Sequence, residues 1–203
     1  MTDKARLVIF ASGEGTNLQA ILDACAAGTL DAEVVALVAD KKCNAIKRAE
    51  AAGVPIIFQM WGPYKVAGKL RETYDRDLAV RVMLYEPDLV VLAGWMRLLT
   101  MGFLEHYGGM VINLHPALPG TFPGMDAIAG AFAASQNGEI TQTGVMVHFV
   151  PDEGVDDGPV ILSEAVPILR DDTLETLAAR VHETEYRVFV KAIQSLIETE
   201  IEN

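Results

Sequence analysis

The chain has 203 residues, 51% of them hydrophobic, which is enough for one domain with a substantial core and cramped for two. Its formal net charge of −12 argues against a nucleic-acid substrate, because proteins that hold a polyanion usually present a basic face. No apolar run reaches the roughly 18 residues of a membrane helix, and the N-terminus has no signal-peptide cleavage site. The two cysteines, Cys25 and Cys43, suit a reducing compartment. We therefore expect a cytoplasmic protein with no membrane partner.

The chain begins with a strand, a glycine-rich turn and a helix. Residues 6–11 form a continuous apolar run, typical of a strand buried on both faces, and residues 18–28 have helical apolar spacing. The turn between them, 12–17, predicts a phosphate cradle at the start of the helix. The third glycine of the dinucleotide fingerprint is absent, although Asp40 leaves a nicotinamide cofactor open. A tight turn that holds no ligand is the other alternative.

Further strands and helices alternate up to residue 99. The pattern predicts strands over 33–39, 55–59 and 88–93, helices over 45–52 and 67–85, and a loop over 61–64. One stripe of the long helix is expected to pack on the sheet, and it consists of Leu70, Tyr74, Leu78, Val82 and Tyr85. Residues 94–99 stay apolar past the end of a strand, so they either pack locally or line a pocket for a flat ligand.

The stretch 111–124 combines a buried strand with a fixed loop. Asn113 and His115 stand two residues apart, so on a strand their side chains point to the same face. Pro116 ends the strand, and the prolines and glycines that follow predict a rigid, irregular loop. Open α/β sheets build sites at such strand ends. The alternative is that Asn113 caps a turn and His115 is a hydrogen-bonded core histidine.

The last third of the chain changes the order of its elements. A helix over 126–135 is followed by strands over 145–150 and 160–168, with an acidic turn at 152–159 between them. This order predicts that an antiparallel hairpin joins a parallel sheet. A closing helix runs over 173–199, with Thr173 as its N-cap. The fold class is therefore α/β, a single domain with a mostly parallel twisted sheet and helices on both faces.

One site could combine three polar groups: the amide of Asn113, the imidazole of His115 and one carboxylate of the acidic turn. No serine or cysteine lies in a nucleophile elbow, so the sequence gives little support to an acyl-enzyme. A metal site would need His115, His148 and an aspartate, and no HxH or HExxH spacing supports it. Direct transfer remains, in which an amine attacks a carbonyl while Asn113 stabilises the oxyanion and His115 handles protons.

Six segments resemble the formyltetrahydrofolate-dependent formyltransferase family, and together they span nearly the whole chain. They are residues 8–21, 70–78, 87–99, 112–124, 147–161 and 178–186. The Asn-x-His-Pro motif at 113–116, followed by Asp-x-Gly at 156–158, is specific to this family. The resemblance implies a formyltransferase-like fold with a nucleotide-binding half, about 1–100, and a folate-binding and catalytic half, about 101–203.

The resemblance also implies an activity, transfer of the formyl group of 10-formyltetrahydrofolate to the amine of glycinamide ribonucleotide in purine biosynthesis. Folate is then a co-substrate, the partners are small molecules, and no metal is required. The alternative within the family is a short form of the formyltetrahydrofolate hydrolase. A non-catalytic nucleotide or folate sensor is the alternative from another class, although it would not need the three polar residues. The oligomeric state is left open, a homodimer included.

Site residues are carried over position by position. Asn113, His115 and Asp156 match the family's catalytic residues, and Asp156 is preferred to Asp157 because it stands two residues before Gly158. The residues matching the substrate site are Gly15, Thr16 and Asn17 for the phosphate and Glu185 for the ribonucleotide. The residues matching the folate pocket are Arg71, Met96, Arg97, Leu98 and Leu99.

The chain departs from the usual family pattern close to these residues. PALPGTF at 116–122 and GVMV at 144–147 replace more common sequences, and one extra residue lies near Pro151. These differences put the formyl acceptor and the register of the acidic turn in question.

Overall fold

The strands that the structure describes join one twisted sheet. The structure is a computed structural model that describes residues 4–201. Within these residues the sheet has seven strands in the order β3-β2-β1-β4-β5-β6-β7. The strands are β1 (Ala5–Phe10), β2 (Ala32–Ala39), β3 (Ile56–Phe58), β4 (Leu89–Leu92), β5 (Val111–His115), β6 (Gln142–Phe149) and β7 (Val160–Pro167). The first five run parallel, and β6 and β7 add an antiparallel hairpin, as the sequence predicts.

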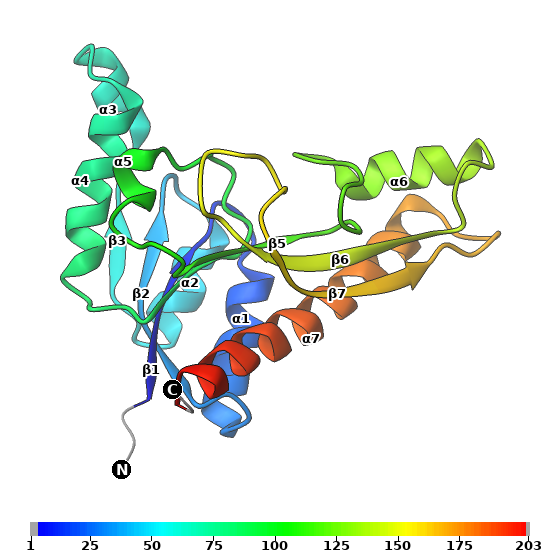
Figure 1. Ribbon diagram of the computed structural model, residues 1–203, viewed down its shortest axis with the longest axis horizontal. Coiled ribbons are helices and arrows are strands. Elements are labelled where there is room, and N and C mark those ends of the chain that lie inside the picture. The colour runs from blue at the N-terminus through cyan, green and yellow to red at the C-terminus, as the bar shows by residue number, and fades with distance from the viewer. Residues whose placement is uncertain (1–3, 202–203) are drawn as a thin grey trace.

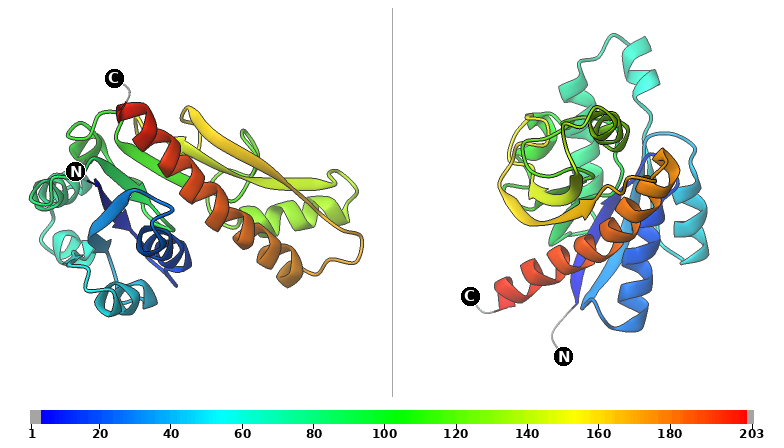
Figure 2. Two further views of the ribbon diagram at one scale, coloured as in Figure 1. Left: turned by 90° about the horizontal axis from the view of Figure 1, so that it is seen from below. Right: turned by 90° about the vertical axis from the view of Figure 1, so that its right-hand side faces the viewer.

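Helices cover both faces of the sheet (Figures 1 and 2). They are α1 (Thr16–Ala27), α2 (Asn44–Ala51), α3 (Trp61–Val66), α4 (Arg71–Met83), α5 (Met101–Leu104), α6 (Ala127–Gln136) and α7 (Leu174–Ile201). Side chains of β1 alternate between the two cores: Leu7 and Ile9 pack with α1 and α7, while Val8 and Phe10 pack with α4 and α5. The expected α/β architecture is confirmed.

The strand order creates the position for a site. The chain proceeds from β1 outward to β2 and β3, and β4 then returns to the opposite side of β1. In open α/β sheets, ligands bind at the carboxyl ends of the strands where the order reverses. The glycine turn after β1 and the segment after β4 both lie at this end, next to the end of β5.

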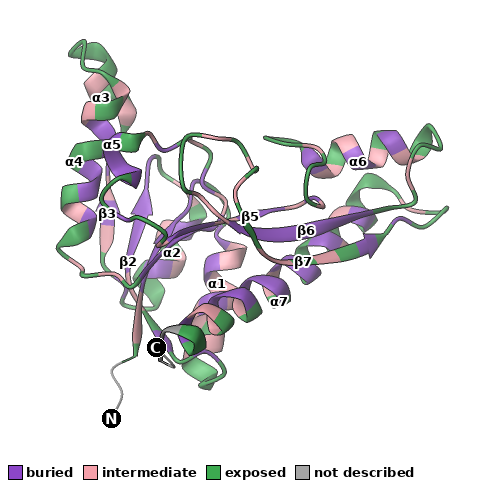
Figure 3. Ribbon diagram, in the orientation of Figure 1, coloured by how far each residue is buried: buried purple, intermediate pink, exposed green. Residues whose placement is uncertain are grey.

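The hairpin β6–β7 reaches away from the rest of the sheet and has α6 beside it (Figure 1). The long helix α7 crosses beneath the sheet, and its inner side is buried along most of its length (Figure 3). Thr173 Oγ1 accepts a hydrogen bond from the Thr176 N–H at 3.3 Å, which confirms the predicted N-cap. None of the helices within residues 4–201 is long and apolar enough to cross a bilayer.

Two predictions between β3 and β4 are wrong. The segment predicted as a loop, 61–64, belongs to the helix α3, because Pro63 lies in the first turn, where a missing N–H costs no intrahelical bond. The long helix starts at Arg71 instead of residue 67, after Gly68 adopts a positive φ of 67°. Leu70 consequently precedes the helix and is 72% exposed. Tyr74, Leu78 and Val82 are buried as predicted.

Candidate active site

The strand β5 ends with the two polar side chains singled out in the sequence. Ile112 and Leu114 point into the core shared with α1 and α7, so Asn113 and His115 point to the other face. The antiparallel register pairs Asn113 with His148 on β6. Directly opposed residues share a face, so His148 joins the amide and the first imidazole.

Asp156 completes this group from the loop between β6 and β7. Its Oδ1 accepts a hydrogen bond from Asn113 Nδ2 at 3.0 Å, and its Oδ2 lies 3.2 Å from His115 Nδ1. The side chain of Asp156 is 12% exposed, whereas Asp157 is exposed to solvent. The structure therefore brings together Asn113, His115 and Asp156, and the extra residue near Pro151 does not shift Asp157 into this position.

The loop after Pro116 fixes the group from the opposite side. His115 Nε2 is 3.0 Å from the Phe122 carbonyl, to which it donates because a carbonyl only accepts. The Gly124 N–H donates to Asp156 Oδ2 at 2.8 Å. Phe122 and Asp156 both have positive φ, 46° and 53°, which is uncommon for residues other than glycine. Such conformations persist where the surrounding contacts determine them, and they cluster at functional sites.

The environment of Asp156 keeps its carboxylate charged. Burial alone would raise its pKa, but a hydrogen bond with His148, the Gly124 N–H and the charges of His115 and His148 outweigh burial and lower the pKa below its usual value. An ionised Asp156, 3.2 Å from His115 Nδ1, orients the imidazole. Both ring nitrogens of His115 face acceptors, an arrangement that suits a proton carrier.

His148 also belongs to this group, although the sequence pointed to it only as a ligand of a weakly supported metal site. Its Nδ1 donates to the Phe149 carbonyl at 2.8 Å, and its Nε2 lies 3.1 Å from Asn113 Nδ2 and 3.5 Å from Asp156 Oδ1. Counting cross-strand pairs from β5 to β6 would have found it, had the register been known. Asn113 Nδ2 lies within reach of both Asp156 and His148, so donation to a substrate oxygen requires it to exchange one of these partners.

A second group forms where the glycine turn meets α7. Gly15 is the N-cap residue of α1 with a φ of 70°, and a Cβ there would lie 2.7 Å from Ala45 of α2. Asn17 Nδ2 contacts Glu185 Oε2 at 3.5 Å, so two of the predicted substrate residues meet although they are 168 positions apart. Asn17 Oδ1 is buried without a hydrogen-bond partner among the described residues. A ligand group that donates a hydrogen bond would satisfy this acceptor.

His182 belongs to this second group and had no predicted role. Its Nδ1 lies 2.8 Å from Glu185 Oε2, one turn along α7. The hydrogen bond to Glu185 raises the pKa of His182, against the opposing effect of burial. His182 and Glu185 are three residues apart on a helix, a spacing that could have suggested the pair.

The predicted folate residues form a third group on the segment after β4. Arg71 Nη2 donates to the Leu98 carbonyl at 2.7 Å, which joins α4 to this segment. Met96 and Leu98 are 56% and 57% exposed, while Leu99 is buried. Arg97 Nε donates to Asp40 Oδ2 at 2.5 Å, so Asp40 holds an arginine of this chain and the nicotinamide alternative gains no support.

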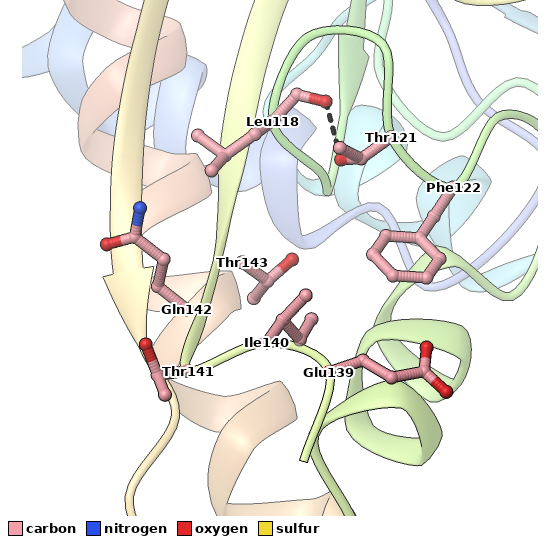
Figure 4. A pocket seen from close by; sticks show the side chains of 8 residues that line it. All are labelled: Leu118, Thr121, Phe122, Glu139, Ile140, Thr141, Gln142 and Thr143. Atoms are coloured by element: carbon pink, nitrogen blue, oxygen red, sulfur yellow. Dashed lines mark hydrogen bonds between the residues drawn. The ribbon is translucent and has the colours of Figure 1, made fainter. Parts of the chain in front are cut away.

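Two cavities lie beside the loop after Pro116. One of about 330 Å³ is bordered by Asp156, Met146 and the loop residues 119–121 and 123. The other, about 500 Å³, lies between the loop and the start of β6, and Figure 4 shows Leu118, Phe122, Ile140 and Thr143 around it. The larger cavity includes none of the predicted site residues, whereas Asp156 borders the smaller one. No cluster of three or more histidine, cysteine, aspartate or glutamate side chains within residues 4–201 is arranged to hold a metal ion.

The chain is similar to known proteins over almost its whole length. The formyl transferase family model matches residues 5–193. Phosphoribosylglycinamide formyltransferase of Schizosaccharomyces pombe is 43% identical over 95% of this chain and 97% of its own. The enzyme of the same name from Bacillus subtilis is 37% identical over 95% of this chain and 94% of its own. The crystal structure of glycinamide ribonucleotide transformylase 1 from Symbiobacterium toebii superposes with a TM-score of 0.89 at 37% identity, covering 98% of this chain and 90% of that one. The chain therefore belongs to the formyl transferase family.

Proposed function

We propose that this enzyme transfers the formyl group of 10-formyltetrahydrofolate to the amine of glycinamide ribonucleotide, a step of purine biosynthesis. The observation that carries the proposal is the convergence of Asn113, His115 and Asp156 at the end of β5. The names of the similar enzymes support glycinamide ribonucleotide as the acceptor. The two cysteines are free thiols, which fits the cytoplasm.

The proposed reaction is a direct transfer. The free amine of the acceptor attacks the formyl carbon, a new C–N bond forms, and the carbonyl oxygen becomes an oxyanion. An Asn113 N–H donates to this oxyanion, an interaction worth about 3–4 kcal/mol where such donors have been removed from other enzymes. The bond from carbon to N10 of tetrahydrofolate then breaks, and the proton lost by the amine reaches N10. His115, oriented by Asp156, assists these proton movements.

The two substrates occupy adjoining sites in this proposal. The ribonucleotide phosphate lies against Gly15, Thr16 and Asn17, with Glu185 contacting the rest of the acceptor, and the helix dipole of α1 favours the anion. The donor lies along Arg71 and the segment from Met96 to Leu99. The acceptor site therefore draws on both halves of the chain, since Asn17 and Glu185 meet.

The proposal is tested by assaying the enzyme with 10-formyltetrahydrofolate, with and without glycinamide ribonucleotide. We expect tetrahydrofolate to appear at a substantial rate only when the acceptor is present, together with formylated ribonucleotide. Release of formate at an equal rate without the acceptor would instead identify a hydrolase. Asn113→Ala should lower kcat by about 10²-fold or more, in line with loss of an oxyanion donor.

A further inference from the structure

We propose that two buried carboxylates, Asp75 and Asp40, are positioning residues of the formyl-donor pocket, and this inference rests on the proposed function. Neither carboxylate belongs to the residues assigned to the donor. Each carboxylate binds an arginine that is assigned to the donor pocket: Asp75 binds Arg71, and Asp40 binds Arg97. Arg71 contacts residues 94–100, and Arg97 belongs to them. This stretch, which we call the donor segment, contains no helix or strand.

Asp75 joins α4 to the far end of the donor segment. Its side chain is fully buried, and both of its oxygens lie 3.1 Å from Arg71 Nε. Its Oδ2 also accepts the Thr100 N–H at 2.9 Å. Because Arg71 Nη2 donates to the Leu98 carbonyl, one carboxylate fixes the backbone directly at residue 100 and through Arg71 at residue 98.

Asp40 acts on the near end of the donor segment from the end of β2. Its side chain is 2% exposed and binds Arg97 Nε. The preceding residue is held as well, since the Met96 N–H donates to Ser12 Oγ at 3.2 Å. Both arginines thus have a charged partner within the protein, and each retains further guanidinium nitrogens for a ligand.

Packing defines only part of this conformation, since Trp95 and Leu99 are buried in the core but the residues between them are not all buried. Met96 and Leu98 are more than half exposed, so few apolar contacts restrain them. Arg71 is restrained from two other sides, with its guanidinium carbon 4.9 Å from the Tyr74 ring centre and 5.8 Å from that of Trp61. Removing one partner of a fully buried ion pair is strongly destabilising, but the side chains of Arg71 and Arg97 are 26% and 31% exposed, so water can solvate either guanidinium when its carboxylate is lost. Loss of either carboxylate should therefore affect donor binding more than folding.

The test is calorimetric binding of 5,8-dideazafolate, a non-reactive donor analogue, to wild type, Asp75→Asn and Glu72→Gln. Glu72 is the matched control, since it lies on the same helix and pairs with Arg76 at 2.9 Å, but on the exposed side. We expect Asp75→Asn to raise the Kd by about 10-fold or more, and Glu72→Gln by less than about 2-fold. In assays, KM for the donor should rise while KM for the ribonucleotide and kcat at saturation stay within about 3-fold.

Equal increases in both KM values, or a Kd within about 3-fold of wild type, would overturn the inference. Asp40→Asn, with exposed Asp31→Asn at the other end of β2 as its control, provides the same test if Asp75→Asn does not fold. A wild-type enzyme that binds no folate analogue would instead contradict the proposed function, so the two failures can be told apart.

Discussion

Asp156 and Asp157 are adjacent in the chain and differ in environment. The backbone of Asp156 turns through a positive φ and directs its carboxylate at Asn113, His115 and the Gly124 N–H. Asp157 instead is exposed to solvent. Its carboxylate lies so close to Gly154 that a Cβ added to this glycine would overlap it. At the scale of single residues, the loop conformation decides which carboxylate faces His115.

Asp156→Asn should lower kcat by about 10²-fold or more with KM nearly unchanged, because the partner of a proton-transfer group acts mainly in the transition state. Asp157→Asn should remain within about 3-fold of wild type. Steady-state kinetics with both substrates provide the comparison. Similar losses in the two variants would contradict the assignment of Asp156.

His182 should make folding stability depend on pH. Its folded pKa is raised by Glu185, so its contribution is full below the unfolded pKa of about 6.5 and is lost as the pH rises through the folded value. The difference in unfolding free energy between wild type and His182→Gln should therefore shrink from about pH 6 to pH 9, and should stay below about 1 kcal/mol because half the ring is exposed.

Urea titrations at several pH values measure this difference. His106→Gln changes an exposed histidine, 3.8 Å from Glu105, and serves as the control. A difference for His182→Gln that does not vary with pH would show that its ion pair makes no net contribution.

The helices α1 and α2 meet at the glycine turn, and this contact determines the shape of the proposed phosphate site. The Ala45 N–H donates to the Gly13 carbonyl at 3.1 Å, which holds the start of α2 against the turn. Gly15 fits beneath Ala45 only because it has no Cβ. Close approach of backbone segments is a common reason for glycine in such turns.

Gly15→Ala should lower the unfolding free energy by about 1–3 kcal/mol, because it adds a positive-φ penalty to overlap with Ala45. The same variant should raise KM for the ribonucleotide more than KM for the donor. Gly13→Ala is the matched control, since a Cβ there meets nothing within 4 Å and the backbone is not in the positive-φ region. Equal KM changes for both substrates would make the turn a purely structural feature.

The helix α7 connects the two halves of the molecule, since it packs beneath strands from both halves of the chain (Figures 1 and 2). Its buried side chains share one core with α1, β1 and β6, so we expect the antiparallel hairpin and the parallel sheet to unfold together. Phe189 is 1% exposed in this core.

Phe189→Ala should lower the unfolding free energy by about 3–5 kcal/mol through lost burial and a new cavity. Leu174→Ala, at the 39% exposed start of the same helix, should cost less than about 1 kcal/mol. Urea unfolding followed by far-UV circular dichroism measures both values. Two separate transitions in either protein would contradict a single cooperative core.

Local patterns in the sequence were sufficient for much of the fold and for half of the site. Three of these predictions rest on patterns within a single element: the continuous apolar run of β1, the alternation that places Asn113 and His115 on one face, and the N-cap preference of Thr173. The family motif at 113–116 could likewise be recognised in the sequence, because its residues are contiguous, and it pointed to formyl transfer.

Contacts between distant elements were decided only by the tertiary structure. The position of His148 depends on the register of β6 against β5. The Asp40–Arg97 pair joins the segments that follow β2 and β4. Asn17 reaches Glu185 only because α7 packs against α1. The helix α3 formed in a stretch whose glycine and proline favour turns, because Trp61 and Tyr64 pack against Tyr74 of α4. Aromatic packing between elements outweighs local preference there, and no local repeat records which elements will meet.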